Sequence, residues 1–154
     1  MIILSVDSSA VAASASLTQG DKILGEFYCN TGLTHSQTLM PMIQCLLQST
    51  KTELKDVDLF AVSAGPGSFT GIRIGVASIK GLAFPFQKPC VGVSTLEAMA
   101  YNLAHIDGTV CAVMDARCGQ VYNAVFEAHH GQLRRITKDR AIATNNLAEE
   151  CEKY

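Results

Sequence analysis

The pattern strand, strand, strand, helix occurs twice in this chain of 154 residues, and it constrains the fold more than any other feature. In the first occurrence the hydrophobic patterns predict strands at 2–7, 11–18 and 22–29 and a helix at 36–50. In the second they predict strands at 109–115, 120–127 and 132–138 and a helix at 144–153. Asp7 and Asp115 each end the first strand of their set. Such self-similarity indicates an internal duplication.

The first copy is longer than the second. It continues through a strand at 58–64, a helix at 69–84, a short strand at 90–93 and a helix at 95–104. We therefore expect an α/β protein with a duplicated actin-like, ribonuclease-H-like fold of the ASKHA type, whose second half is truncated. The expected domains are a first ribonuclease-H-like subdomain at 1–104 and the incomplete start of a second at 105–154.

Two such halves hold a nucleotide in the cleft between them, and the turns after Asp7 and Asp115 would face that cleft. The candidates for a vestigial nucleotide site are Asp7, Ser8, Ser9, Asp115 and Arg117. The turn at Asp7 has the residues to hold phosphate or Mg²⁺, but we favour a strand-end Asx turn, because the other elements of a full site are not all present. Arg117 is suited either to bind an anion or to pair with one of the two aspartates.

A glycine-rich segment, GPGSFTG at 65–71, joins the strand at 58–64 to the helix at 69–84. A P-loop needs Lys and then Ser or Thr after its last glycine, and here Ile72 and Arg73 follow Gly71. The dinucleotide fingerprint needs a glycine where Thr70 stands. We therefore interpret the segment as a structural turn with Ser68 or Thr70 as helix N-cap, leading into a helix that contacts a partner.

Composition excludes several classes of protein. The chain is 48% hydrophobic, with a net charge of −2, so a charge-driven nucleic-acid surface is not indicated. The six cysteines form no Cys-x-x-Cys pair, and the four histidines do not fall at ligand spacing with them, so we expect no metal and no cofactor. The apolar start is too short for a signal peptide, and no stretch approaches a membrane span. We expect a cytoplasmic protein with reduced, buried thiols.

The helices at 36–50 and 69–84 carry more apolar surface than one sheet face needs, which indicates a protein–protein interface. The candidates are apolar or small residues recurring at helical spacing. They are Leu39, Met42, Ile43, Leu46, Gly71, Ile72, Gly75, Val76, Ile79 and Ala83.

Five segments, taken in order, closely resemble the TsaB (YeaZ) family. They are residues 3–9 (ILSVDSS), 35–43 (HSQTLMPMI), 65–75 (GPGSFTGIRIG), 92–96 (GVSTL) and 114–117 (MDAR). The resemblance implies a non-catalytic paralogue of TsaD. It implies pairing with TsaD, engagement of the small ATPase TsaE, and homodimers in isolation. The implied assembly transfers a threonylcarbamoyl group to the adenosine next to the anticodon of tRNAs that read codons beginning with A, so tRNA is met only through the complex.

The resemblance also permits a check on catalysis. In TsaD a His-x-x-x-His pair holds the catalytic metal, and Thr95 and Met99 stand in the corresponding places here. Hydroxyl and thioether groups are poor ligands for such a metal, so no catalytic residue is expected. The alternatives are a peptidase-like or nucleotide-hydrolysing enzyme that uses Asp7, Asp115 and His35, and a stand-alone sugar or acetate kinase of the same fold. No Gly-x-Ser-x-Gly elbow supports a hydrolase.

Overall fold

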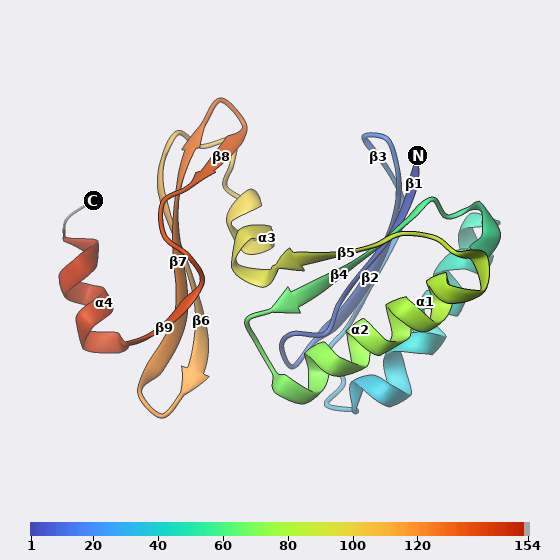
Figure 1. Ribbon diagram of the computed structural model, residues 1–154, viewed down its shortest axis with the longest axis horizontal. Helices are drawn as coiled ribbons and strands as arrows, with labels where there is room; N and C mark the ends of the chain where they lie inside the picture. Colours follow the sequence, from blue (N-terminus) through green and yellow to red (C-terminus); the bar gives the residue numbers. More distant parts are fainter. Residues whose placement is uncertain (153–154) are drawn as a thin grey trace. The chain divides into compact units, whose positions relative to one another are not determined.

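The computed structural model describes residues 1–152 and divides into two compact units, Met1–Val93 and the chain from Ser94 onward, which we treat separately (Figure 1). The first unit contains β1 (Ile2–Asp7), β2 (Ala13–Gln19), β3 (Lys22–Cys29), α1 (His35–Thr50), the short 3-10 helix η1 (Leu54–Asp56), β4 (Leu59–Gly65), α2 (Phe69–Ala83), η2 (Phe84–Phe86) and β5 (Cys90–Ser94). The second contains α3 (Thr95–Tyr101), β6 (Gly108–Arg117), β7 (Gln120–His129), β8 (Gln132–Arg135), β9 (Arg140–Ala143) and α4 (Thr144–Cys151).

The first unit is built on a five-stranded sheet in the order β3-β2-β1-β4-β5. Strands β1, β2 and β3 form an antiparallel meander, and β4 pairs with β1 in parallel. Along β1, Leu4 and Val6 are buried while their neighbours are half-buried, as expected when only one face of a strand meets the core. The order of elements confirms the predicted succession of three strands, a helix, a strand, a helix and a strand.

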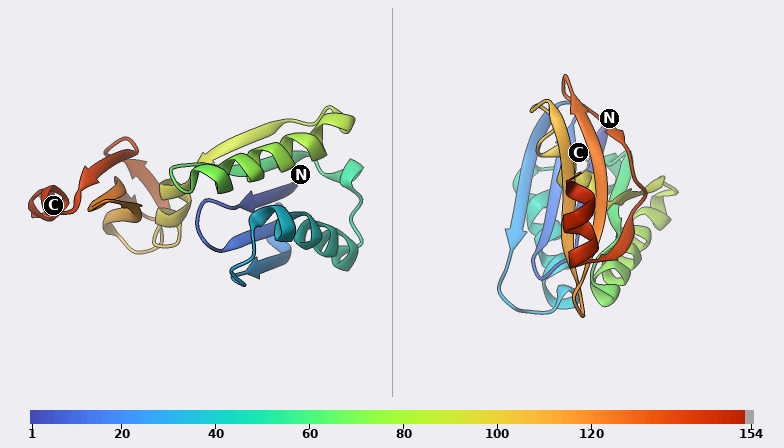
Figure 2. Two further views of the ribbon diagram at one scale, coloured as in Figure 1. Left: turned by 90° about the horizontal axis from the view of Figure 1, so that it is seen from below. Right: turned by 90° about the vertical axis from the view of Figure 1, so that its left-hand side faces the viewer.

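Helices α1 and α2 share one face of that sheet, where α1 packs on β2 and β3 and α2 packs on β4 and β1 (Figures 1 and 2). Their buried side chains join those of the strands in a single hydrophobic core. The fully buried members with the largest side chains are Leu4, Leu17, Leu39, Ile43, Leu46, Phe60 and Ile79. Thr34 and Gln37 form a capping box at the start of α1, which fixes where this helix begins.

The second unit is a four-stranded antiparallel sheet with β7 at its centre. β6 pairs with β7 along its length, β8 pairs with one end of β7 at Phe126–His129, and β9 pairs with the other end at Gln120–Asn123. Helix α3 packs on β6 and β7, and α4 lies on the opposite face of this sheet (Figure 2, right). The strand predicted at 132–138 is wrong in its extent, because β8 ends at Arg135, and the strand β9 at Arg140–Ala143 was not predicted.

The compact units divide after Val93, before the predicted subdomain boundary at residue 104. Leu96 and Ala100 of α3 are buried against Val110, Ala112 and Phe126 of the second unit, so α3 belongs by its contacts with the sheet that follows it. The division into ribonuclease-H-like subdomains at residue 104 stays a prediction. Across residues 1–152, no helix has the length and apolar character that spanning a bilayer requires.

Candidate functional site

The turn after β1 is an Asx turn. The Asp7 carboxylate accepts a hydrogen bond from the Ser9 backbone N–H at 2.7 Å, and Ser8 and Ser9 are almost fully buried. The Ser8 hydroxyl donates to the Gly71 carbonyl at 2.8 Å. These bonds commit Asp7 and Ser8 to holding the turn, as the Asx-turn interpretation requires.

The glycine loop packs directly on this turn. The Ser68 N–H donates to the Ser9 carbonyl at 2.6 Å. A methyl group on Gly67 would overlap the Ser9 carbonyl, one on Gly71 would overlap the Ser8 carbonyl, and one on Gly75 would overlap the Ser8 hydroxyl. The three glycines therefore serve the close approach of α2 to the protein's own backbone.

The N-terminus of α2 is occupied by the chain itself. Ser68 is the N-cap, as predicted, and its hydroxyl accepts from the Gly71 N–H at 3.2 Å, while its carbonyl accepts from the Ile72 N–H at 2.9 Å. A phosphate would have to compete with these internal partners for the Ser68 and Gly71 N–H groups. This geometry supports a structural turn over a phosphate cradle.

His35 is tied to the same turn. Its Nε2 lies 2.8 Å from the Ala10 carbonyl, and it is the first residue of α1. A shallow hollow of about 180 Å³ lies beside it, lined by Thr34, Thr70 and Ile74 among others. His35 thus makes the structural hydrogen bond expected of a residue at the start of a helix.

The second aspartate repeats the geometry of the first within its own unit. Asp115 accepts from the Arg117 N–H at 2.7 Å, and Arg117, Cys118 and Gly119 follow with positive φ angles. Among residues 1–152, neither Asp115 nor the Arg117 side chain forms an ion pair. The nucleotide cleft composed of both turns stays a prediction, because the two turns belong to different units.

Thr95 and Met99 stand where the resemblance places the metal-binding histidine pair of TsaD. Thr95 is buried with no partner for its hydroxyl, and Met99 is partly exposed. Glu97, between them, binds Arg135 at 2.7 Å. Burial lowers the pKa of Arg135, but its hydrogen bonds to Glu97 and Asp139 raise it further, so the pKa lies above its ordinary value. Glu97 is therefore held as an ion-pair partner.

Most of the predicted interface residues lie in the core of the first unit. Eight of the ten are buried: Leu39, Met42, Ile43, Leu46, Gly71, Gly75, Ile79 and Ala83. Because a buried side chain already has its partners, these residues contribute to folding and have little area left for another protein. Only Ile72 and Val76 are partly exposed.

Those two residues lie at the edge of an exposed stripe of α2, and Val76 also packs against the core of the first unit. We call this the α2 outer face: Phe69, Ile72, Arg73, Val76, Lys80 and the adjoining Phe84 of η2. Phe69 is 69% exposed and Phe84 is 83% exposed, and the Arg73 guanidinium lies 3.6 Å from the centre of the Phe69 ring. Sequence reasoning missed both phenylalanines, although their spacing from Val76, at i−7 and i+8, matches a helical stripe.

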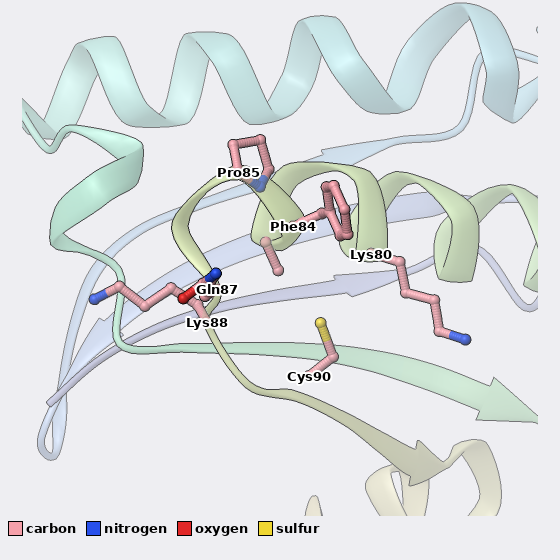
Figure 3. Close-up of a pocket in the computed structure, with 7 residues that line it drawn as sticks. Lys80, Phe84, Pro85, Gln87, Lys88 and Cys90 are labelled. Atoms are coloured by element: carbon pink, nitrogen blue, oxygen red, sulfur yellow. The ribbon is translucent and has the colours of Figure 1, made fainter.

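One end of the α2 outer face borders a hollow of about 700 Å³ (Figure 3). Phe84 and Pro85 line it from above, and Cys90 of β5 lies below with its thiol pointing toward the helix. Lys80 and Lys88 flank it, and Ala83 also lines it. Its walls are mainly apolar and its charges are positive, so the exposed face of α2 continues into a concave, cation-flanked surface. Cys90 is exposed, as are Cys45, Cys118 and Cys151, and Cys29 and Cys111 are only half-buried, so the prediction of buried thiols is wrong.

Comparison with known proteins agrees with this geometry. The family model described as "TsaD: tRNA N6-adenosine threonylcarbamoyltransferase" matches residues 30–152. The tRNA threonylcarbamoyladenosine biosynthesis protein TsaB of Escherichia coli K12 is 38% identical over 97% of this chain and 65% of its own length. The protein of that name from Bacillus subtilis 168 is 34% identical over 92% of this chain and 62% of its own length.

A solved structure, YeaZ from Pseudomonas aeruginosa, superimposes with a TM-score of 0.84 at 31% identity, covering 92% of this chain and 67% of that one. The sheet order of the first unit and the repeated meander define an α/β protein of the duplicated, actin-like class. Within that class, the chain belongs to the TsaB (YeaZ) family. It spans less than two thirds of the length of the two curated relatives described above.

Proposed function

We propose that this chain is a non-catalytic subunit in the threonylcarbamoylation of tRNA. The target is the adenosine next to the anticodon of tRNAs that read codons beginning with A. The observation that carries the proposal is the 34–38% identity, over 92–97% of the chain, to proteins named for tRNA threonylcarbamoyladenosine biosynthesis. The proposed role is cytoplasmic, and the chain would meet tRNA only within the complex.

The chemistry of the described residues supports a dependent subunit. Thr95 and Met99 offer a hydroxyl and a thioether where a metal-binding histidine pair would stand, and Glu97 is bound by Arg135. Asp7, a candidate for an enzymatic role, accepts a hydrogen bond from the Ser9 N–H. A TsaD-type subunit would therefore supply the catalytic centre, and a TsaE-type ATPase would engage the pair.

The α2 outer face is the proposed surface for the TsaD-type subunit. It combines exposed aromatic rings with Arg73 and Lys80, a composition typical of interface cores and their rims. Two copies of this chain would present the same face to each other in the absence of that partner, which accounts for a homodimer in isolation. The two associations are then mutually exclusive.

Val76→Glu tests the surface. A carboxylate at the centre of the α2 outer face would be desolvated on docking, and we expect affinity for the TsaD-type subunit to fall about 100-fold. Gly81→Glu is the matched control, because it adds the same charge to the same helix at an exposed position about 140° around the axis from Val76. A side chain there starts in open space. Ile79→Glu is uninformative, because Ile79 is fully buried and a charge there would unfold the unit.

Two measurements test the proposed binding surface and the proposed function independently. Binding is measured by size-exclusion chromatography and calorimetry with the TsaD-type subunit, and equal affinity of V76E and G81E would contradict the proposed surface. Function is measured by tRNA modification in a reconstituted mixture with the TsaD-type and TsaE-type proteins. Modification that proceeds equally well when this chain is omitted would contradict the proposed function itself.

A further inference from the structure

Two histidines and an aspartate gather at one end of the second unit's sheet. Asp107 directly precedes β6, His129 is the last residue of β7, and His130 begins the turn to β8. One ligand atom from each side chain lies within 4.8 Å of the others. The two imidazole ring centres are 4.0 Å apart. These residues come from segments more than twenty positions apart, so the fold brings them together.

The aspartate is already oriented for a ligand. The His130 backbone N–H donates to Asp107 Oδ1 at 2.8 Å, which leaves Oδ2 facing His129 Nδ1 at 3.4 Å. Two ligand atoms bound at about 2.05 Å to one tetrahedral ion lie about 3.3 Å apart. The observed separation matches that value, and the backbone bond is the kind of supporting contact that fixes a metal-binding carboxylate.

The backbone at His130 is unusual for a histidine. His130 and Gly131 form a two-residue hairpin loop with φ angles of +50° and +81°, as a type I′ turn requires. Asn or Gly at the first position adopts this conformation at lower cost. His130 adopts this less favourable backbone conformation, and its ring lies beside the ring of His129.

The neighbouring charged side chains do not prevent Asp107 from binding a metal ion. Glu127 lies on the same face of β7 as His129, but both of its contacts are to Arg134, at 2.9 and 2.7 Å. Among residues 1–152, the ion pair of Asp107 is with His129 alone. A hollow of about 320 Å³ lined by Asp107, Thr109, Glu127 and His129 gives solvent access from the side.

We propose that Asp107, His129 and His130 bind a divalent transition-metal ion, with Zn²⁺ as the best fit. Two imidazole nitrogens and one carboxylate oxygen suit Zn²⁺, Co²⁺ or Ni²⁺ and disfavour Mg²⁺ and Ca²⁺, which take oxygen ligands. Water completes the coordination. The ion clamps the residue before β6 to the β7–β8 turn. From the sequence we expected no metal, because we compared the histidines with the cysteines alone.

The test is metal titration of the tag-free, freshly reduced chain. Calorimetry with Zn²⁺ should show one ion per chain with a Kd of about 1–100 μM, and Zn²⁺ should raise Tm. His130→Asn removes a ligand while suiting the positive φ, and it should weaken binding at least about tenfold without lowering Tm in the absence of metal. His129→Gln should weaken binding similarly. His105→Asn, at an exposed histidine outside the cluster, is the control and should bind as the parent does.

The absorption spectrum of bound Co²⁺ distinguishes binding at this cluster from binding at the cysteine thiols. Nitrogen and oxygen ligands give weak visible bands without the near-ultraviolet charge-transfer band of cobalt–thiolate bonds. Cys111 and Cys151, whose sulfurs lie 3.9 Å apart, are the competing ligands. Unchanged affinity in H130N would overturn the proposal. A thiolate band that disappears in C151S together with binding would overturn it too, as would a Kd weaker than about 1 mM.

Discussion

The turns at Asp7 and Asp115 have the same local hydrogen bond and different surroundings. In each, the aspartate accepts from the N–H two residues later at 2.7 Å. The first turn is buried beneath the glycine loop, whereas the second is exposed. The aspartate therefore determines the turn, and the loop that packs on it determines burial. A duplicated motif has kept its local chemistry in two different tertiary settings.

The sheets differ in a similar way. In the first unit β3 is one continuous strand and both helices lie on one face. In the second unit the corresponding row is divided into β8 and β9, and α3 and α4 lie on opposite faces (Figure 2). The order of elements is shared, but each unit completes its core with different partners.

The largest expected effect tests whether the glycine loop is essential to the first turn. Gly71→Ala would place a methyl group on the Ser8 carbonyl, and we expect the free energy of unfolding of the first unit to fall by about 3 kcal/mol or more. Gly81→Ala is the control on the same helix, where a methyl group has no heavy atom within 4 Å, and it should stabilise by about 0.5–1 kcal/mol. Urea unfolding followed by circular dichroism measures both. Equal midpoints would show that the loop can move away from the turn.

An intermediate effect is expected at the polar centre of the second unit. Asn123 is buried, donates to the Ala112 carbonyl at 3.2 Å and accepts from Arg140 at 3.0 Å. Asn123→Leu would leave part of the Arg140 guanidinium without its partner, and we expect a loss of about 2 kcal/mol in urea unfolding. Asn146→Leu, at an exposed position of α4, should change stability by less than about 0.5 kcal/mol.

The Asn123→Leu variant should also change the reactivity of the Cys111 thiol. Burial raises the pKa of Cys111, the neighbouring Cys151 raises it further, and a hydrogen bond from Asn123 to the sulfur opposes both. In Asn123→Leu the opposing bond is lost, so the pKa rises and the thiolate fraction at mildly alkaline pH falls. Alkylation of Cys111 by iodoacetamide should therefore slow, as mass spectrometry of the labelled peptide would show. Faster labelling would mean that the substitution opens the sheet.

The smallest effect compares the two aspartates directly. Asp7→Ala removes the acceptor of a buried N–H and should cost about 1–2 kcal/mol, whereas Asp115→Ala in the exposed turn should cost about 0.5 kcal/mol, because water replaces the carboxylate. Thermal unfolding of both variants measures the difference. Equal costs would contradict the assigned role of burial. Below its melting temperature, D7A should still support tRNA modification, whereas an enzyme that uses Asp7 would lose activity.

The order of elements followed from the sequence because local signals determine it. Apolar alternation located the strands of both meanders, and Ser68 marked the start of α2. The ends were less accurate: α3 ends at Tyr101 instead of 104. The strand predicted at 132–138 ends at Arg135, and β9 at Arg140–Ala143 was missed, because only the pairing with β7 reveals these two short strands.

The candidate surface was harder to predict than the fold. Residues such as Leu39 and Ile79 have the periodicity of a helix face, but periodicity alone does not say whether that face meets a sheet or another protein. Gly71 and Gly75 were assigned to a partner because their contact, the Ser8 turn, is more than sixty residues away in sequence. The cluster of Asp107, His129 and His130 was missed because the histidines were compared with the cysteines and not with the aspartates.

Thr137 shows what the interruption between β8 and β9 requires. In this interruption the Val125 N–H donates a hydrogen bond to the Thr137 hydroxyl at 2.8 Å. The Val125 carbonyl accepts hydrogen bonds from the Ile136 and Thr137 N–H groups. A side chain thus replaces one rung of the backbone ladder at the middle of the central strand. The Val125 N–H therefore depends on one hydroxyl, and we expect a substitution that removes that oxygen, such as Thr137→Val, to speed the exchange of the Val125 amide proton with solvent.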